Sequence, residues 1–141
     1  MFFLFISYYY IISDIMSDNL NLKNKLSKLA FDVTQNSSTE RAFSGRFYDF
    51  FENGIYTCVC CDENLFSSEH KFVSKSGWPS FYQPINSNVI KYLKDDSYGM
   101  TRVEVSCKKC NAHLGHVFDD GPLPTNKRYC INSVSLNFVK K

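Results

Sequence analysis

The residues best suited to chemistry in this 141-residue chain are its six cysteines. Four of them form two C-x-x-C pairs, in which Cys58 precedes Cys61 and Cys107 precedes Cys110. A C-x-x-C turn presents two thiolates to one ion, and two such turns complete a closed tetrahedral site of the kind that holds structural zinc. The spacing therefore predicts a structural Zn²⁺ site, which can contribute on the order of 10 kcal/mol to folding.

Other arrangements of these residues are alternatives to that site. Because six is an even number, disulfides or a redox-active C-x-x-C pair also fit the count. A local zinc site at uniform three-residue steps would use Cys107, Cys110, His113 and His116. It would leave the matching pair Cys58 and Cys61 without a role, so we favour the four-cysteine site. We interpret Cys60, which lies inside the first pair, as a bystander thiol.

The remaining cysteine, Cys130, lies outside both pairs on a predicted strand. Alternate residues of a strand share a face, so Arg128 and Asn132 should lie on the same face as Cys130. A guanidinium beside a thiol lowers the pKa of that thiol and raises its thiolate fraction. The pattern predicts a site of thiol chemistry, and the alternative is a buried structural cysteine.

Two histidines and an acid precede this strand, at His113, His116 and Asp120. On a regular strand the two histidines would face opposite sides, but Gly115 permits a bulge that would bring both to one face. We expect them to join Cys130 in one site. The only tryptophan, Trp78, is predicted to form an aromatic wall for an apolar or methyl-bearing substrate, the alternative being a core position.

The elements that must position these residues are mostly short strands between turn signals. Strand-like runs cover Gly54–Cys58, Met100–Cys107 and Tyr129–Val139, separated by Gly, Asn, Asp and Pro. The sequence therefore predicts a mainly antiparallel β domain. Leucines at helical spacing predict one short amphipathic helix over roughly residues 18–30, with Ser17 as its cap.

The first sixteen residues differ from the rest of the chain, so we expect an N-terminal extension or targeting segment over 1–16 and the folded domain over 17–141. The apolar run at residues 2–12 is too short to span a bilayer, which takes about 20 residues, and we expect no stable membrane insertion. Translation from Met16 would predict a cytoplasmic protein. A targeting segment at 1–15 would predict an organellar or secretory-pathway protein.

Composition excludes several classes of protein. The length corresponds to one domain, since about 150 residues is typical of a domain. A net charge of +2 lacks the basic excess of a nucleic-acid binder, so we predict no nucleic-acid partner. Nothing in the sequence requires more than a monomer.

From about Phe31 to Phe138 the chain resembles the methionine sulfoxide reductase B family, the methionine-R-sulfoxide reductases. The motifs that carry the resemblance are Thr39-Glu40, Phe43-Ser-Gly45, Gly54-Ile-Tyr-Thr-Cys58, Ser76-Gly-Trp-Pro-Ser-Phe-Tyr82, His113-Leu-Gly-His-Val-Phe118, Asp120-Gly-Pro122 and Arg128-Tyr-Cys-Ile-Asn-Ser133. The resemblance implies two antiparallel sheets in a tent-like arrangement, short N-terminal helices and a structural zinc. It also implies an enzyme that reduces the R epimer of methionine sulfoxide, free or in proteins.

The resemblance also implies roles for individual residues. Cys130 would attack the sulfoxide sulfur, and His113 or His116 would supply the acid, one of them oriented by Asp120. Arg128 would hold Cys130 as a thiolate, and Asn132 would position substrate or water. The substrate-binding residues would be Trp78, which receives the S-methyl group, and Phe118.

The chain departs from many family members at Ser76, where they carry a cysteine that resolves the sulfenic acid. We therefore expect thioredoxin, glutathione or another thiol to reduce Cys130, or Cys60 to act as an alternative resolving cysteine. The alternative to an enzyme is a zinc-stapled module of similar fold that binds a ligand or protein without catalysis.

Overall fold

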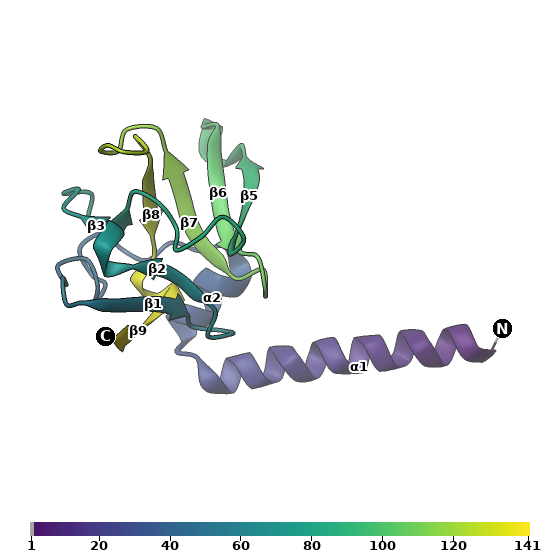
Figure 1. Cartoon of the computed structure of the whole chain (residues 1–141). Helices are drawn as coiled ribbons and strands as arrows, with labels where there is room; N and C mark the ends of the chain where they lie inside the picture. Colours follow the sequence, from purple (N-terminus) through teal and green to yellow (C-terminus); the bar gives the residue numbers. More distant parts are fainter. Residues whose placement is uncertain (1) are drawn as a thin grey trace.

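The computed structural model describes residues 2–141 (Figure 1). Two helices precede the sheets, α1 at Phe2–Lys25 and α2 at Lys28–Asn36. The smaller sheet has the order β2-β1-β9, with β1 at Gly54–Cys58, β2 at Asn64–Ser67 and β9 at Leu136–Lys140. Its strands pair antiparallel.

The larger sheet has the order β3-β4-β8-β7-β6-β5 and is also antiparallel throughout. Its strands are β3 at Lys71–Phe72, β4 at Ser80–Phe81, β5 at Ile90–Asp95, β6 at Arg102–Cys107, β7 at His113–Phe118 and β8 at Arg128–Ile131. The prediction of two antiparallel sheets with N-terminal helices is confirmed.

Aromatic side chains from both sheets form the core between them. Tyr56 of β1 and Phe66 of β2 are fully buried against Phe81 of β4. The ring centroids of Phe66 and Phe81 are 4.5 Å apart in a stacked arrangement, and those of Tyr56 and Phe81 are 5.1 Å apart edge to face. Such pairs add about 0.5–1.5 kcal/mol to the free energy of burial, so the aromatic core holds the sheets together.

The predicted strand Tyr129–Val139 is two strands in the structure. The chain leaves the larger sheet at the end of β8, makes a 3₁₀ turn at Ser133–Ser135 and enters the smaller sheet as β9. An alternating pattern gives the spacing of side chains but not the sheet to which each half belongs. This segment therefore links the two sheets directly.

The predicted helix over residues 18–30 is wrong in its bounds. One helix runs through Ser17 and ends at Lys25, and a second begins at Lys28. The hydroxyl of Ser27 accepts a hydrogen bond from the Ala30 N–H at 3.1 Å, so Ser27 rather than Ser17 is the N-cap. Among residues 2–141, no helix combines the length and apolar character that crossing a membrane requires.

The predicted bulge beside Gly115 is confirmed. Val105 of β6 pairs with Gly115 of β7, but the next residue, Ser106, pairs with His113, so Leu114 is the extra residue. The bulge places His113 and His116 side by side, with ring centroids 5.7 Å apart. A local irregularity in β7 thus assembles the histidine pair.

Gly115 is also a point of close approach between β7 and β8. It pairs with Ile131, and a Cβ atom at this position would overlap the carbonyl oxygen of Cys130. The obstacle is backbone, which cannot move aside as a flexible side chain can. Only glycine fits here without displacing the strand that carries Cys130.

We predict that Gly115→Ala lowers the free energy of unfolding by about 3 kcal/mol, because the added methyl forces β7 and β8 apart. Urea denaturation measures the change. Gly99→Ala is the control, since no atom lies within 4 Å of a Cβ there and its φ of +69° adds only about 1 kcal/mol of backbone strain. Equal destabilisation by the two substitutions would contradict the close approach.

Candidate active site and metal centre

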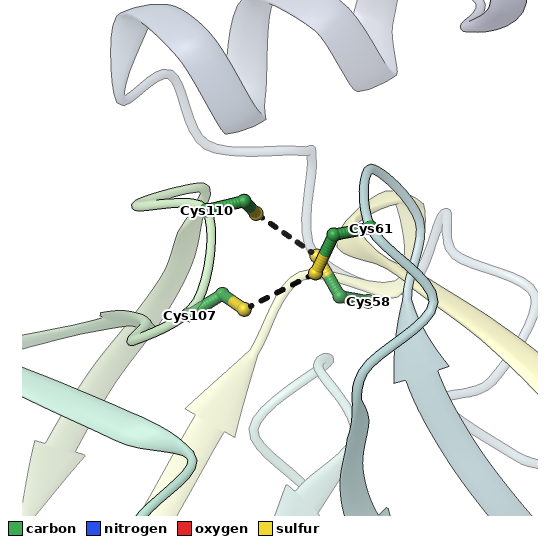
Figure 2. Close-up of side chains that lie close together, drawn as sticks. All are labelled: Cys58, Cys61, Cys107 and Cys110. Carbon is green, nitrogen blue, oxygen red and sulfur yellow. Dashed lines mark hydrogen bonds between the residues drawn. The ribbon is translucent and has the colours of Figure 1, made fainter.

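The four paired cysteines come together in one cluster (Figure 2). The sulfur atoms of Cys58 and Cys110 are 3.6 Å apart, as are those of Cys61 and Cys107, and all four lie within 4.8 Å of one another. Four sulfurs at 2.3 Å from a tetrahedral zinc would be about 3.8 Å apart. The cluster could bind a metal ion, and its spacing and donor set fit zinc.

The two C-x-x-C turns have the same backbone construction. Asp62 follows the first pair with φ 65° and donates its N–H to the carbonyl of Cys58 at 2.9 Å. Asn111 follows the second pair with φ 64° and donates to the carbonyl of Cys107 at 2.7 Å. This repetition favours one cluster over the local site that would combine the second pair with His113 and His116.

Cys60 lies beside this cluster and apart from Cys130. Its sulfur accepts a hydrogen bond from the Gln35 side chain at 3.6 Å, and it faces a cavity that it shares with Cys110 and Lys25. Cys130 faces a different pocket, and the residues that line the two have no member in common. A direct disulfide between Cys60 and Cys130 would therefore require a large rearrangement.

Cys130 lies near the middle of the larger sheet, where β8 runs between β4 and β7. It pairs with Ser80 on one side and His116 on the other. It lines a pocket of about 100 Å³ together with Trp78, His116 and Phe118. The size of the pocket suits the end of a methionine-sized side chain. Aromatic rings and the Cys130 thiol would surround a group bound there.

The environment of the Cys130 thiol acts on its pKa in opposite directions. Burial raises the pKa, and this effect is the largest. The positive charge of Arg128 and hydrogen bonds from Ser76 and Arg128 lower it. The net result is a pKa above the usual value, so the resting group is a thiol rather than a thiolate.

Arg128 is held in place by Asp120 and Phe118. Its Nε and Nη2 donate to the two carboxylate oxygens of Asp120 at 2.9 and 3.1 Å, and its guanidinium lies 4.5 Å from the centre of the Phe118 ring. The predicted contact between Asp120 and a histidine is therefore wrong. The loop that carries Asp120 folds back onto the start of β8, where Arg128 is the nearest cation.

Each histidine has a carboxylate partner that the sequence analysis did not identify. His113 Nδ1 lies 2.8 Å from Glu104 Oε1, and His116 Nε2 lies 2.7 Å from Asp95 Oδ2. Glu104 could have been found, because it alternates with apolar residues along β6. Asp95 stands next to Asp96, and an Asp-Asp pair is typical of a turn, so it offered no such signal.

The free nitrogen differs between the two rings. His113 is 4% exposed, and its Nε2 is buried without a hydrogen-bond partner among the described residues. His116 lines the pocket itself, and its Nδ1 is the nitrogen that Asp95 leaves free. Burial lowers the pKa of His116 more than Asp95 raises it, so this ring is neutral near pH 7.

Asn132 and Trp78 are both tied to Glu40. The Asn132 side chain accepts from the Glu40 N–H at 2.9 Å and donates to the Leu114 carbonyl at 3.0 Å, while Trp78 Nε1 donates to the Glu40 carbonyl at 3.1 Å. The Glu40 carboxylate in turn accepts from the N–H of Val134 at 2.9 Å. Glu40 therefore links two residues of the pocket to the 3₁₀ turn that follows β8.

This geometry defines a class of small two-sheet domains. Each has a four-cysteine cluster and, apart from it, a thiol in a pocket lined by aromatic residues and histidine. Residues 26–140 match the SelR domain family. The chain belongs to that family, and its membership favours an enzyme over a non-catalytic binding module.

Known relatives agree with this assignment. The chain is 58% identical over 118 residues to the "Peptide methionine sulfoxide reductase MsrB" of Thioalkalivibrio sulfidiphilus, covering 84% of this chain and 86% of the relative. It is 53% identical, with the same coverage, to the proteins of that name from Escherichia coli O139:H28 and K12. The crystal structure of the Mis18 "Yippee-like" domain matches with a TM-score of 0.51 and 17% identity over 64% of this chain and 98% of that one, which shows a shared fold.

We predict that Arg128→Leu slows alkylation of Cys130 at neutral pH severalfold. Removing the guanidinium raises the thiol pKa further, and each pKa unit lowers the thiolate fraction about tenfold. Iodoacetamide labelling read by mass spectrometry at Cys130 measures the rate. Lys127→Leu is the control because this neighbouring lysine pairs with the exposed Asp119; equal slowing by both variants would argue against a specific contact.

Proposed function

We propose that the chain is a peptide-methionine (R)-S-oxide reductase, which repairs oxidised methionine in proteins or as the free amino acid, and that Cys130 is its nucleophile. The observation that carries this proposal is the Cys130 thiol in a pocket of about 100 Å³ walled by Trp78, Phe118 and His116. The relatives named peptide methionine sulfoxide reductase support the reaction class.

In the proposed reaction the sulfur of Cys130 attacks the sulfoxide sulfur. The sulfoxide oxygen is protonated and passes to the cysteine sulfur, so methionine leaves and Cys130 becomes a sulfenic acid. Sulfoxide and thiol together contain all the atoms of methionine and sulfenic acid, and the two electrons that reduce methionine come from the cysteine. The protein must therefore move one proton from the thiol to the oxygen.

His116 is the residue that we assign to this proton transfer. It is neutral near pH 7 and lines the pocket beside Cys130, so its free Nδ1 can take the thiol proton and deliver it to the sulfoxide oxygen. Arg128 then stabilises the thiolate as it forms. His113 has a free Nε2 and its ring centroid lies 5.7 Å from that of His116, so we assign it a supporting role in proton transfer, while Asn132 aligns substrate from the end of β8.

The aromatic residues account for the choice of substrate. Trp78 is held by its bond to the Glu40 carbonyl, and Phe118 is covered by the Arg128 guanidinium. Between them the apolar S-methyl group can be buried while the sulfoxide oxygen faces the histidines. We assign the methyl group to Trp78 and the neighbouring methylene groups to Phe118.

The sulfenic acid is reduced by a thiol from outside the chain, of the thioredoxin or glutathione type. Ser76, which lowers the pKa of Cys130, has no sulfur and cannot form a disulfide, and Cys60 faces another cavity. One external thiol condenses with the sulfenic acid to give a mixed disulfide and water, and a second thiol then releases Cys130. The enzyme needs no second subunit for these steps and is proposed to act as a monomer.

The four-cysteine cluster holds Zn²⁺ in this proposal and has a structural role. Cys58 ends β1 of the smaller sheet, and Cys107 ends β6 of the larger one, so the ion connects the two sheets. A site in which all four ligands are protein sulfurs leaves no position for substrate. Reduction of the sulfoxide takes place in the other pocket, at Cys130.

We predict that Cys130→Ser lowers the rate of methionine-R-sulfoxide reduction at least about a thousandfold, because a hydroxyl cannot replace the nucleophilic thiol. The assay follows R- and S-sulfoxide peptides with dithiothreitol as the reductant. Cys60→Ser should retain wild-type activity. Activity of Cys130→Ser equal to wild type, or a preference for the S epimer, would refute the proposal.

We predict one zinc ion per chain and a large fall in the melting temperature on treatment with a strong chelator, since metal binding supplies folding energy. Atomic absorption and thermal denaturation measure the two quantities. Cys61→Ser should lose the metal, while Cys60→Ser should keep it. A melt that resists the chelator would count against a structural metal site.

A further inference from the structure

The carboxylate of Asp95 lies at the end of the edge strand β5, outside every motif that drew attention to the active site. It crosses the face of β6 to reach His116, with 2.7 Å between Asp95 Oδ2 and His116 Nε2. Its backbone pairs with Arg102 on β6, the strand between it and β7. The edge of the sheet therefore contributes a charged group to the pocket-lining histidine.

Hydrogen-bond donors surround this carboxylate. Oδ2 lies 2.7 Å from His116 Nε2 and accepts from Arg102 Nη2 at 3.3 Å, and Oδ1 accepts from the Ser97 N–H at 2.9 Å. The Ser97 hydroxyl also stabilises the charged form and helps to keep the pKa of Asp95 well below its usual value. Asp95 is thus an ionised group whose oxygens are held from several directions.

The two histidine–carboxylate pairs are not equivalent in relation to the pocket. His116 lines the pocket that contains Cys130, whereas Glu104 holds His113, which is buried. Of the two carboxylates, Asp95 therefore controls the ring that borders the substrate. Asp95 itself does not line the pocket, but its partners His116 and Arg102 both do, so its effect on the reaction must pass through one of these two side chains.

We propose that Asp95 is a positioning residue for the reduction, and that it holds His116 in one orientation and one tautomer, with the proton on Nε2 and the lone pair on Nδ1. This inference rests on the proposed function. An ionised carboxylate can only accept, so the nitrogen that faces it must carry the hydrogen. Nδ1 is then left ready to receive the proton of the Cys130 thiol.

The charged groups around His116 indicate that Asp95 orients a neutral imidazole ring and does not keep the ring protonated. Asp95 from β5 favours the imidazolium, whereas Arg102 from β6 and His113 from β7 disfavour it, and burial disfavours it most. Glu104, also on β6, is directed to His113. Arg102 shares Oδ2 of Asp95, so it both fixes the carboxylate and offsets its charge.

The test is Asp95→Asn, with Asp96→Asn as the matched control. The carboxylate of Asp95 accepts hydrogen bonds through both oxygens, whereas an amide has one acceptor oxygen and one donor nitrogen. The asparagine therefore cannot accept from all of the surrounding donors, and the tautomer of His116 is no longer fixed. We expect kcat/KM to fall about tenfold or more, through kcat, with a shifted pH profile. Asp96 is exposed and bonds to Thr101 and Lys94, so its variant should stay within twofold of wild type.

Two further measurements separate positioning from a loss of folding and from a failure of the proposed function. In a His116→Gln background, Asp95→Asn should change kcat/KM by less than twofold, whereas a general structural defect would lower it equally in both backgrounds. Nitrogen-15 NMR of His116 should show the Nε2–H tautomer in the wild type and its loss in Asp95→Asn, irrespective of activity.

Wild-type kcat/KM and pH profile in Asp95→Asn would overturn the inference and leave the proposed function intact. A Nδ1–H tautomer in the wild-type protein would overturn it as well. A wild-type enzyme inactive on methionine-R-sulfoxide would instead refute the proposed function, and the NMR spectrum would still decide the state of His116.

Discussion

The structure depends on the close approach of β7 and β8 at Gly115. The absence of a side chain there lets the backbone of Cys130 come into contact with β7, and the bulge beside it turns His113 and His116 to the same side. From this contact β8 leads through a 3₁₀ turn into β9, which joins the smaller sheet. The thiol, the histidines and the link between the sheets therefore share one short stretch of backbone.

The four-cysteine cluster and the pocket that contains Cys130 lie in different parts of the fold. The paired cysteines occur where strands end in tight turns, at the close of β1 and β6. Cys130 lies within a strand, surrounded on both sides by paired strands. A group that must meet substrate in a defined geometry gains from this rigid support, since its neighbours have little freedom to shift.

The parts of the fold and site that sequence could predict are those set by local spacing. Two C-x-x-C pairs favour one four-cysteine cluster, a glycine between two histidines permits a bulge, and alternation around Cys130 predicts a strand. The structure has all three. The wrong predictions concern the bounds of the N-terminal helix and the partners of side chains that loops bring together. The resemblance implies that Asp120 orients a histidine, but the loop brings Asp120 to Arg128, while Asp95 reaches His116 from twenty-one residues away in the sequence.

The raised pKa of Cys130 affects how fast oxidants modify this thiol. Peroxides react with thiolates, and a thiol that stays protonated is a poor target for them. A permanently ionised cysteine would be consumed by the same oxidants that convert methionine to its sulfoxide. In the proposed reaction the thiol loses its proton as it attacks the sulfoxide, so a Cys130 that rests as a thiol reacts slowly with the oxidants that produce its substrate.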